Sequence, residues 1–140
     1  MYEYKCTVTR IVDGDTIDAK IHLGFDISFD SRIRLYGVDT PESRTRDLDE
    51  KARGKLASSF LKEKIEGAKV VKVQTKLDKK GKYGRVLGTI FADDLDLNLE
   101  MINKNLAVAY HGQSKDDIEA EHILNREKLI KAGVFTPTES

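Results

Sequence analysis

Five charged side chains in three short motifs carry the chemistry that this sequence suggests. Three are carboxylates and two are guanidinium groups, and all lie beside strand-like runs and turns. Carboxylates bind hard cations and guanidinium groups bind phosphate oxygens, so the set contains the groups that metal-assisted cleavage of a phosphodiester requires. The motifs are Val12-Asp13-Gly14-Asp15-Thr16, Arg34-Leu35-Tyr36-Gly37-Val38-Asp39-Thr40-Pro41-Glu42 and Lys82-Tyr83-Gly84-Arg85. Together they indicate an enzyme that acts on phosphodiester bonds.

Each motif taken alone also has an ordinary structural explanation. The pair Asp13-Gly14 is typical of a hairpin turn. The segment 39–42 has the residues of a common exit from a strand toward a helix, where a carboxylate serves the turn. The lysine-rich run at 79–82 is typical of a solvated turn. Only the two carboxylate motifs together, combined with two arginines, favour catalysis.

The composition fits one domain but does not by itself indicate a nucleic-acid partner. With 140 residues, 39% of them hydrophobic, the chain can form one core, so we predict a single domain over residues 1–140. The 24 basic and 24 acidic side chains cancel. Affinity for a polyanion must therefore come from local clusters of lysine and arginine. The single cysteine, Cys6, lies in a strand-like alternation and is predicted to be a core residue.

Hydrophobic periodicity predicts a fold made mainly of strands. The predicted strands cover residues 5–12, 16–23, 32–38, 70–75 and 85–91, and the predicted helices cover residues 49–65, 97–103 and 116–132. Five short strands with a helix inserted after the third are typical of the OB-fold, a barrel that can bind nucleic acid on one face. The expected class is α+β, mainly β: a five-stranded OB-fold Greek-key barrel with about three helices.

The sequence carries no signal for a membrane. Its apolar runs are all shorter than the roughly 18 residues of a membrane span. Residues 1–4 lead directly into a strand pattern, without the basic and apolar segments of an export signal. We therefore expect no membrane association and a cytoplasmic monomer for the sequence as written, or a secreted protein if a leader had been removed.

The order and spacing of the three motifs resemble those of the staphylococcal nuclease (thermonuclease) family, in particular its leaderless bacterial or phage-type members. The similarity runs from about Val8 to Tyr110 and includes the order of the predicted elements. The resemblance implies an OB-fold barrel and a calcium-dependent phosphodiesterase that hydrolyses DNA and RNA. It also implies cleavage within the nucleic-acid chain that leaves 5′-hydroxyl and 3′-phosphate ends.

The resemblance further implies a role for each motif residue. The catalytic residues would be Arg34, Glu42 and Arg85, the metal ligands Asp15, Asp39 and the backbone carbonyl of Thr40, and the substrate contacts Lys82, Tyr83 and Tyr110. An all-oxygen ligand set favours a hard divalent cation such as Ca²⁺ or Mg²⁺, and only the resemblance favours calcium between them. Tyr110 would stack on or flank a base of a single strand, with ordinary core packing as the alternative.

Some features depart from the family pattern or stay without a role. Secreted family members are typically basic, whereas this chain has a net charge of zero, which predicts modest substrate affinity. Two residues after Tyr110, where the best-known family member has a second tyrosine, this chain has Gly112, which predicts a more open base pocket. The histidines His22, His111 and His122 lack the short spacings of metal ligands. We assign them surface or hydrogen-bonding roles and no chemistry.

Two other functions remain open. The first is a non-catalytic OB-fold module that binds nucleic acid or protein. The intact carboxylates argue against it, because carboxylates facing a polyanion weaken binding unless a cation neutralises them. The second is a metal-dependent enzyme for a small nucleotide or phosphate ester, which would use the same five charged residues.

Overall fold

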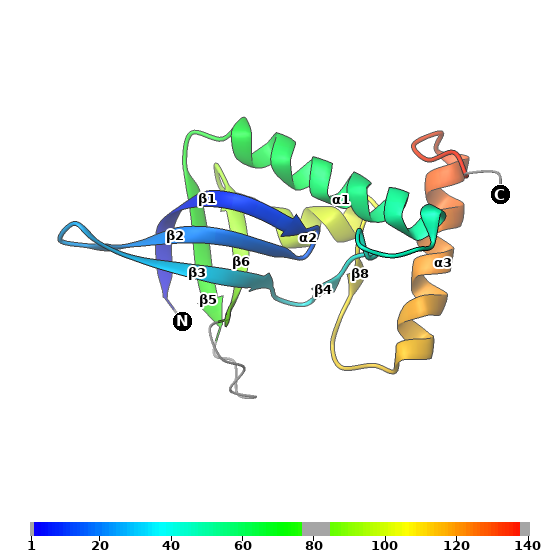
Figure 1. Cartoon of the computed structure of the whole chain (residues 1–140), viewed down its shortest axis with the longest axis horizontal. Coiled ribbons are helices and arrows are strands. Elements are labelled where there is room, and N and C mark those ends of the chain that lie inside the picture. The colour runs from blue at the N-terminus through cyan, green and yellow to red at the C-terminus, as the bar shows by residue number, and fades with distance from the viewer. Residues whose placement is uncertain (1, 77–84, 138–140) are drawn as a thin grey trace.

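Among residues 2–76 and 85–137, which the computed structural model describes, five strands close into a barrel (Figure 1). Antiparallel pairs join neighbouring strands in the order β3-β2-β1-β5-β6, and a parallel pairing of β3 with β6 closes the ring. The barrel strands are β1 (Glu3–Asp13), β2 (Thr16–Gly24), β3 (Ile27–Leu35), β5 (Val71–Lys76) and β6 (Arg85–Ala92). This confirms the predicted five-stranded OB-fold barrel.

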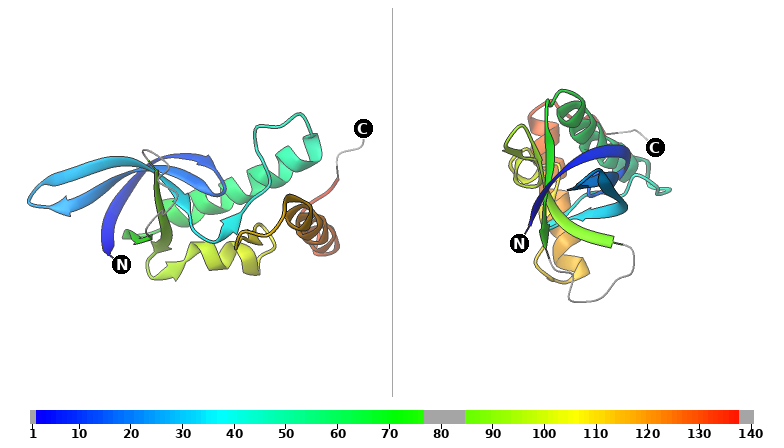
Figure 2. Two further views of the ribbon diagram at one scale, coloured as in Figure 1. Left: turned by 90° about the horizontal axis from the view of Figure 1, so that it is seen from below. Right: turned by 90° about the vertical axis from the view of Figure 1, so that its left-hand side faces the viewer.

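The helices gather on one side of the barrel. The described helices are α1 (Leu48–Glu66), α2 (Leu97–Asn103) and α3 (Lys115–Lys131), as predicted to within one residue at each end. Helix α1 packs against β1, and α2 packs against β6. Helix α3 crosses the end of the molecule opposite the β2–β3 hairpin (Figures 1 and 2). In the part of the chain that the structure describes, no helix combines the length and the apolar character needed to cross a membrane.

Alternating apolar side chains fill the barrel, as the sequence pattern predicts. Ile17, Ile33 and Ile90 are fully buried, and the apolar face of α1 adds further core residues. Cys6 is also buried, which confirms its predicted place in the core. Burial raises the pKa of its thiol to about 11, so Cys6 stays protonated and unreactive at neutral pH.

The predicted strand at 32–38 is wrong at both ends. Strand β3 starts earlier and stops at Leu35, and the chain then turns at Gly37, which has a positive φ of 76°. After the turn, the short strand β4 (Val38–Asp39) pairs with β8 (Val108–Ala109) and not with the barrel; a further short strand, β7 (Leu95–Asp96), pairs with β6. This turn redirects Asp39 toward α3.

A buried amide fixes that turn in place. The Nδ2 atom of Asn98, on α2, donates to the carbonyl oxygens of Tyr36 (2.9 Å) and Gly88 (3.1 Å). Its Oδ1 atom accepts from the backbone N–H of Ile90 at 3.2 Å. Asn98 is only 5% exposed, so these backbone groups have a partner where water has little access. One side chain thus joins α2, β6 and the end of β3.

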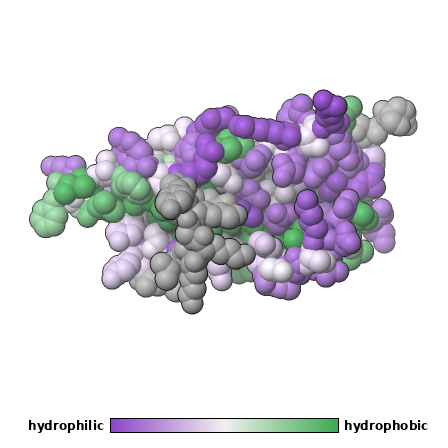
Figure 3. Space-filling view, turned by 60° about the horizontal axis from the view of Figure 1, so that its bottom comes forward, coloured by the Kyte–Doolittle hydropathy of each residue, from purple (hydrophilic) through white to green (hydrophobic). Residues whose placement is uncertain are grey.

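The hairpin of β2 and β3 extends beyond the barrel as a two-stranded ribbon (Figure 2). At its tip Phe25 is 99% exposed, and Phe25 and Asp26 both have positive φ angles, as a tight two-residue turn requires. Large apolar side chains nearby are exposed too: Leu23, Ile27 and Phe29. Figure 3 shows this hydrophobic cluster on the projecting end of the molecule.

Candidate active site

The turn between β1 and β2 brings the first motif against the second. Gly14 at this turn is buried. A Cβ atom there would lie 2.6 Å from Cβ of Ala57 in α1 and 3.0 Å from Cγ2 of Thr40. Only glycine therefore lets the turn pack this closely. Asp15, the next residue, is consequently held beside the segment that follows β4.

Asp15 is tied to both neighbouring segments. The backbone N–H of Thr40 donates to Oδ2 of Asp15 at 3.2 Å, and the hydroxyl of Thr16 donates to Oδ1 at 3.1 Å. The backbone carbonyl of Asp15 accepts from the N–H of Leu35 at 2.8 Å. The carboxylate therefore has a fixed orientation, with its side chain 15% exposed.

Arg34 lies between Asp15 and Asp39, the two carboxylates expected to bind a metal ion. Its Nη2 atom is 3.6 Å from Oδ2 of Asp15 and 3.9 Å from Oδ1 of Asp39. Its Nη1 atom donates to the carbonyl oxygen of Leu35 at 2.9 Å and approaches that of Asp15 at 3.4 Å. The guanidinium is thus anchored through one nitrogen while the other faces two carboxylates.

The second oxygen of Asp39 has a partner that sequence reasoning missed. Nε2 of His122, on α3, lies 2.7 Å from Oδ2 of Asp39, and the His122 side chain is 13% exposed. The two residues are separated by 83 positions. No spacing pattern signals such a contact, because it arises from the docking of α3.

Glu42 lies on the segment after β4, where negative charge accumulates. Its backbone N–H donates to Oε2 of Glu50 at 3.3 Å. The pKa of Glu42 is raised, first by partial removal from water and then by the charges of Asp13, Glu50, Asp15 and Asp39. Asp13 is itself held in place by a hydrogen bond from the hydroxyl of Ser43. Four carboxylates thus act on Glu42, which is a setting that a bound cation would stabilise.

A glycine in α1 sets the position of Glu42. A Cβ atom on Gly54 would lie 2.7 Å from the carbonyl oxygen of Pro41 and 2.8 Å from the carbonyl carbon and oxygen of Glu42. These are backbone atoms, so the Pro41-Glu42 segment would have to move away from the helix. Gly54 therefore permits the close approach that places Glu42 near the aspartates.

We expect Gly54→Ala to destabilise the protein by about 1–3 kcal/mol, the usual cost of overpacking a close contact. Urea unfolding would measure the change. The matched control is Lys55→Ala, which alters an exposed residue in the same helical turn and should change stability by less than about 0.5 kcal/mol. Equal effects of the two substitutions would contradict the close contact as the cause.

The proposed metal ligands fit a hard cation in their chemistry. Asp15 and Asp39 supply carboxylate oxygens around one guanidinium nitrogen, and Thr40 joins them through its N–H bond to Asp15. The buried hydroxyl oxygen of Thr40 has no hydrogen-bond partner among the described residues. Within residues 2–76 and 85–137, no three acidic, histidine or cysteine side chains converge as a metal-binding group. A cation here would therefore depend on two carboxylates, a backbone carbonyl and water.

Two of the other predicted site residues are placed by backbone contacts, and two lie outside the described residues. Arg85 pairs with Arg32 in the β3–β6 ladder, two positions before the partner of Arg34. Tyr110 follows β8, is 40% exposed, and donates its backbone N–H to the carbonyl of Gly37 at 2.8 Å. Tyr110 is therefore not a fully buried core residue, and its contact with substrate stays a prediction. Lys82 and Tyr83 lie outside the described residues.

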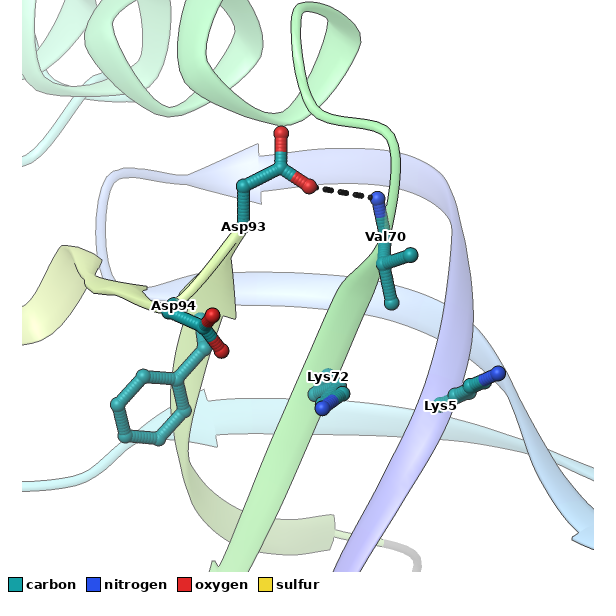
Figure 4. Close-up of a pocket in the computed structure, with 6 residues that line it drawn as sticks. Lys5, Val70, Lys72, Asp93 and Asp94 are labelled. Carbon is teal, nitrogen blue, oxygen red and sulfur yellow. Dashed lines mark hydrogen bonds between the residues drawn. The ribbon is translucent and has the colours of Figure 1, made fainter.

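A surface pocket elsewhere on the barrel has a structural explanation. Lys5, Val70, Lys72, Phe91, Asp93 and Asp94 line it (Figure 4). Asp93 accepts backbone hydrogen bonds from Lys69 and Val70, each as short as 2.9 Å. These bonds lower its pKa, so Asp93 acts as an ionised cap for the start of β5. The pocket shares no residue with the Asp15–Arg34–Asp39 group.

The family model described as staphylococcal nuclease homologue matches residues 32–133 of this chain. The chain belongs to the staphylococcal nuclease family. Arg34, Asp39, Thr40, Glu42, Arg85 and Tyr110 all lie within the matched residues, and Asp15 precedes them. The family assignment agrees with the OB-fold barrel described above.

Relatives of this staphylococcal nuclease homologue include proteins with nuclease names. An uncharacterised protein of Bacillus anthracis is 31% identical over 135 residues, which cover 94% of this chain and 61% of that protein. Endonuclease YhcR of Bacillus subtilis is 34% identical over 114 residues, or 77% of this chain and 9% of YhcR. Thermonuclease of Staphylococcus intermedius is 34% identical over 106 residues, which cover 73% of this chain and 57% of that protein. The chain thus spans less than two thirds of each of these relatives.

Proposed function

We propose that this chain is a metal-dependent nuclease that hydrolyses phosphodiester bonds within DNA and RNA. The observation that carries the proposal is the position of Arg34 between Asp15 and Asp39, with Glu42 on the adjoining segment. Cation-binding, phosphate-binding and proton-accepting groups thereby meet at one place on the barrel. The nuclease names of two relatives support the same reading.

We propose calcium as the cofactor, with magnesium or another hard divalent cation as the alternative. Asp15, Asp39 and the backbone carbonyl of Thr40 would hold the ion. When bound, it would supply positive charge to the phosphoryl oxygens and offset the accumulation of carboxylates around Glu42.

The chain's own residues would perform the remaining steps. Arg34 donates hydrogen bonds to the phosphate, whose negative charge increases in the transition state. Arg85 would provide the second guanidinium. Glu42 accepts the proton of the attacking water, and its partial removal from water, which raises its pKa, makes it a stronger base than an ordinary glutamate. Cleavage would leave 5′-hydroxyl and 3′-phosphate ends.

Substrate binding would involve Lys82, Tyr83 and the exposed Tyr110. Because Tyr110 offers an aromatic surface beside the turn that leads to Asp39, we propose a preference for single strands, whose bases are free to stack. Comparing native with denatured DNA tests this preference. Comparing polymer with dinucleotide substrates separates a nuclease from an enzyme for small phosphate esters.

Metal removal is the direct test of the proposed activity. The purified protein is incubated with denatured DNA and calcium, with magnesium, or with excess chelator, and acid-soluble fragments are measured. We expect release with calcium and its loss with chelator, followed by recovery when calcium is restored. Release that persists in chelator would contradict metal dependence. A folded sample that releases nothing with either ion would favour the non-catalytic binding module.

A further inference from the structure

The bond between His122 and Asp39 links the C-terminal helix to the proposed cation site. Nε2 of His122 lies 2.7 Å from Oδ2 of Asp39, which is the short distance typical of hydrogen bonds to a charged group. An ionised carboxylate can only accept, so Nε2 donates. With the His122 side chain 13% exposed, water competes little for this bond.

The two oxygens of Asp39 therefore have different partners. Oδ1 faces Nη2 of Arg34 at 3.9 Å, and Oδ2 accepts from His122. These two contacts, one at each oxygen, restrict the rotation of the carboxylate. A carboxylate held in one orientation binds a cation with a smaller loss of conformational entropy than a freely rotating one.

His122 itself does not complete a ligand set. Within the described ranges, no third histidine, cysteine or acidic side chain joins His122 and Asp39 in a group that could hold a metal. A hard, oxygen-preferring cation also has little affinity for an imidazole nitrogen. The imidazole is thus placed to act on Asp39 and not on the ion.

Other contacts hold α3 in place independently of Asp39. One turn after His122, Nε of Arg126 lies 3.1 and 3.0 Å from the two carboxylate oxygens of Asp49 at the start of α1. The side chain of Asn125 donates to the carbonyl of Ala107 at 3.1 Å, and Leu129 is buried in the core. The position of the imidazole is therefore set by the packing of α3.

We propose that His122 is a positioning residue that holds the carboxylate of Asp39 in the orientation required for cation binding. This inference rests on the proposed metal-dependent function. Loss of a hydrogen bond to a ligating carboxylate typically costs about 10- to 100-fold in metal affinity or activity. His122→Leu should accordingly weaken calcium binding by about 10- to 100-fold, and the calcium needed for half-maximal activity should rise in parallel.

The test measures the calcium dissociation constant by titration calorimetry on the folded full chain. His122→Gln should retain most of the affinity, because its amide nitrogen can reach the position of Nε2. His122→Asn, which is polar but too short to reach Asp39, should lose as much as His122→Leu. Circular dichroism checks that each variant is folded. If the leucine variant does not fold, the comparison of the two amide variants still tests the proposal.

Arg126→Gln is the matched control, because it removes the ion pair with Asp49 while Asn125 and Leu129 still hold α3 in place and Asp39 keeps its contacts. It should lower stability and leave calcium affinity close to that of the wild type. If it weakens calcium binding as much as His122→Leu does, the His122 contact serves only to dock the helix, and the positioning role is overturned.

The remaining outcomes separate this inference from the proposed function. If His122→Leu binds calcium as tightly as the wild type does, the positioning role is overturned and the nuclease proposal is unaffected. A folded wild-type protein that binds no calcium would overturn both the positioning role and the calcium-dependent activity. In that case, nuclease activity that persists in chelator would show that only the metal dependence is wrong, and absence of activity would show that the nuclease proposal itself is wrong.

Discussion

Arg34→Lys is expected to lower kcat by about a hundredfold or more, because removal of one transition-state donor typically costs about 2.7–4 kcal/mol. A lysine ammonium cannot reproduce the planar fork that is anchored on the carbonyl of Leu35 while its second nitrogen faces Asp15 and Asp39. Because lysine keeps the positive charge, a lower kcat would show that the geometry of the guanidinium donors matters. Steady-state kinetics on denatured DNA at saturating calcium measure the effect.

The same strand offers a matched control. Arg32 lies two residues before Arg34 and makes an exposed ion pair with Asp18 at 2.9 Å. Arg32→Lys should leave kcat nearly unchanged, since exposed ion pairs contribute little. We expect Arg85→Lys to behave as Arg34→Lys does, on the strength of the motif. A decrease of less than about threefold in both Arg34→Lys and Arg85→Lys would remove the two arginines from the mechanism.

Glu42→Gln is expected to lose most activity, by about 10²- to 10⁴-fold, the usual contribution of a general base. The substitution keeps the size of the side chain and does not change the proposed ligands Asp15, Asp39 and Thr40. Calcium binding should therefore persist while turnover is lost. Kinetics and calorimetry on the same sample measure both quantities, and unchanged turnover would disprove the role of Glu42.

The raised pKa of Glu42 has consequences for pH dependence and stability. A base must be ionised, so activity should fall as pH decreases through the pKa of Glu42, which partial removal from water raises and which a bound cation would lower again. Glu50→Gln keeps the acceptor for the Glu42 N–H but removes one of the charges that raise the pKa, so the acidic limb of the pH profile should move to lower pH. If the acidic limb of the pH profile does not move, it reports the ionisation of a group other than Glu42.

The raised pKa of Glu42 makes folding stability change with pH in the direction opposite to that caused by a salt-bridged carboxylate, whose pKa is lowered. Glu42 binds its proton more tightly in the folded protein than in the unfolded chain, so stability decreases as pH rises from the unfolded to the folded pKa. Above that window the ionised carboxylate disfavours folding. Glu42→Gln should therefore make the metal-free protein more stable at neutral pH, while Glu42→Gln and wild type should converge at low pH.

The sequence by itself determined the elements of the fold and the residues worth testing. Strand and helix patterns depend on neighbours within a few residues, which is why α1, α2 and α3 were predicted to within one residue at each end. The motif around Asp39 was recognisable for the same reason, because its residues are consecutive. The catalytic and metal-binding roles of these residues stay predictions.

Only the tertiary structure decided how these residues meet. The end of β3 at Leu35 depends on the hydrogen bonds of Asn98, which lies 62 residues after Tyr36. Apolar residues continue through Leu35, Tyr36 and Val38, and a single glycine at position 37 is also found within strands, so the local pattern does not identify the turn. Likewise, His122 contacts Asp39 only because α3 docks against β8, the strand that pairs with β4. Such contacts follow from the packing of distant elements, and no short-range sequence pattern encodes them.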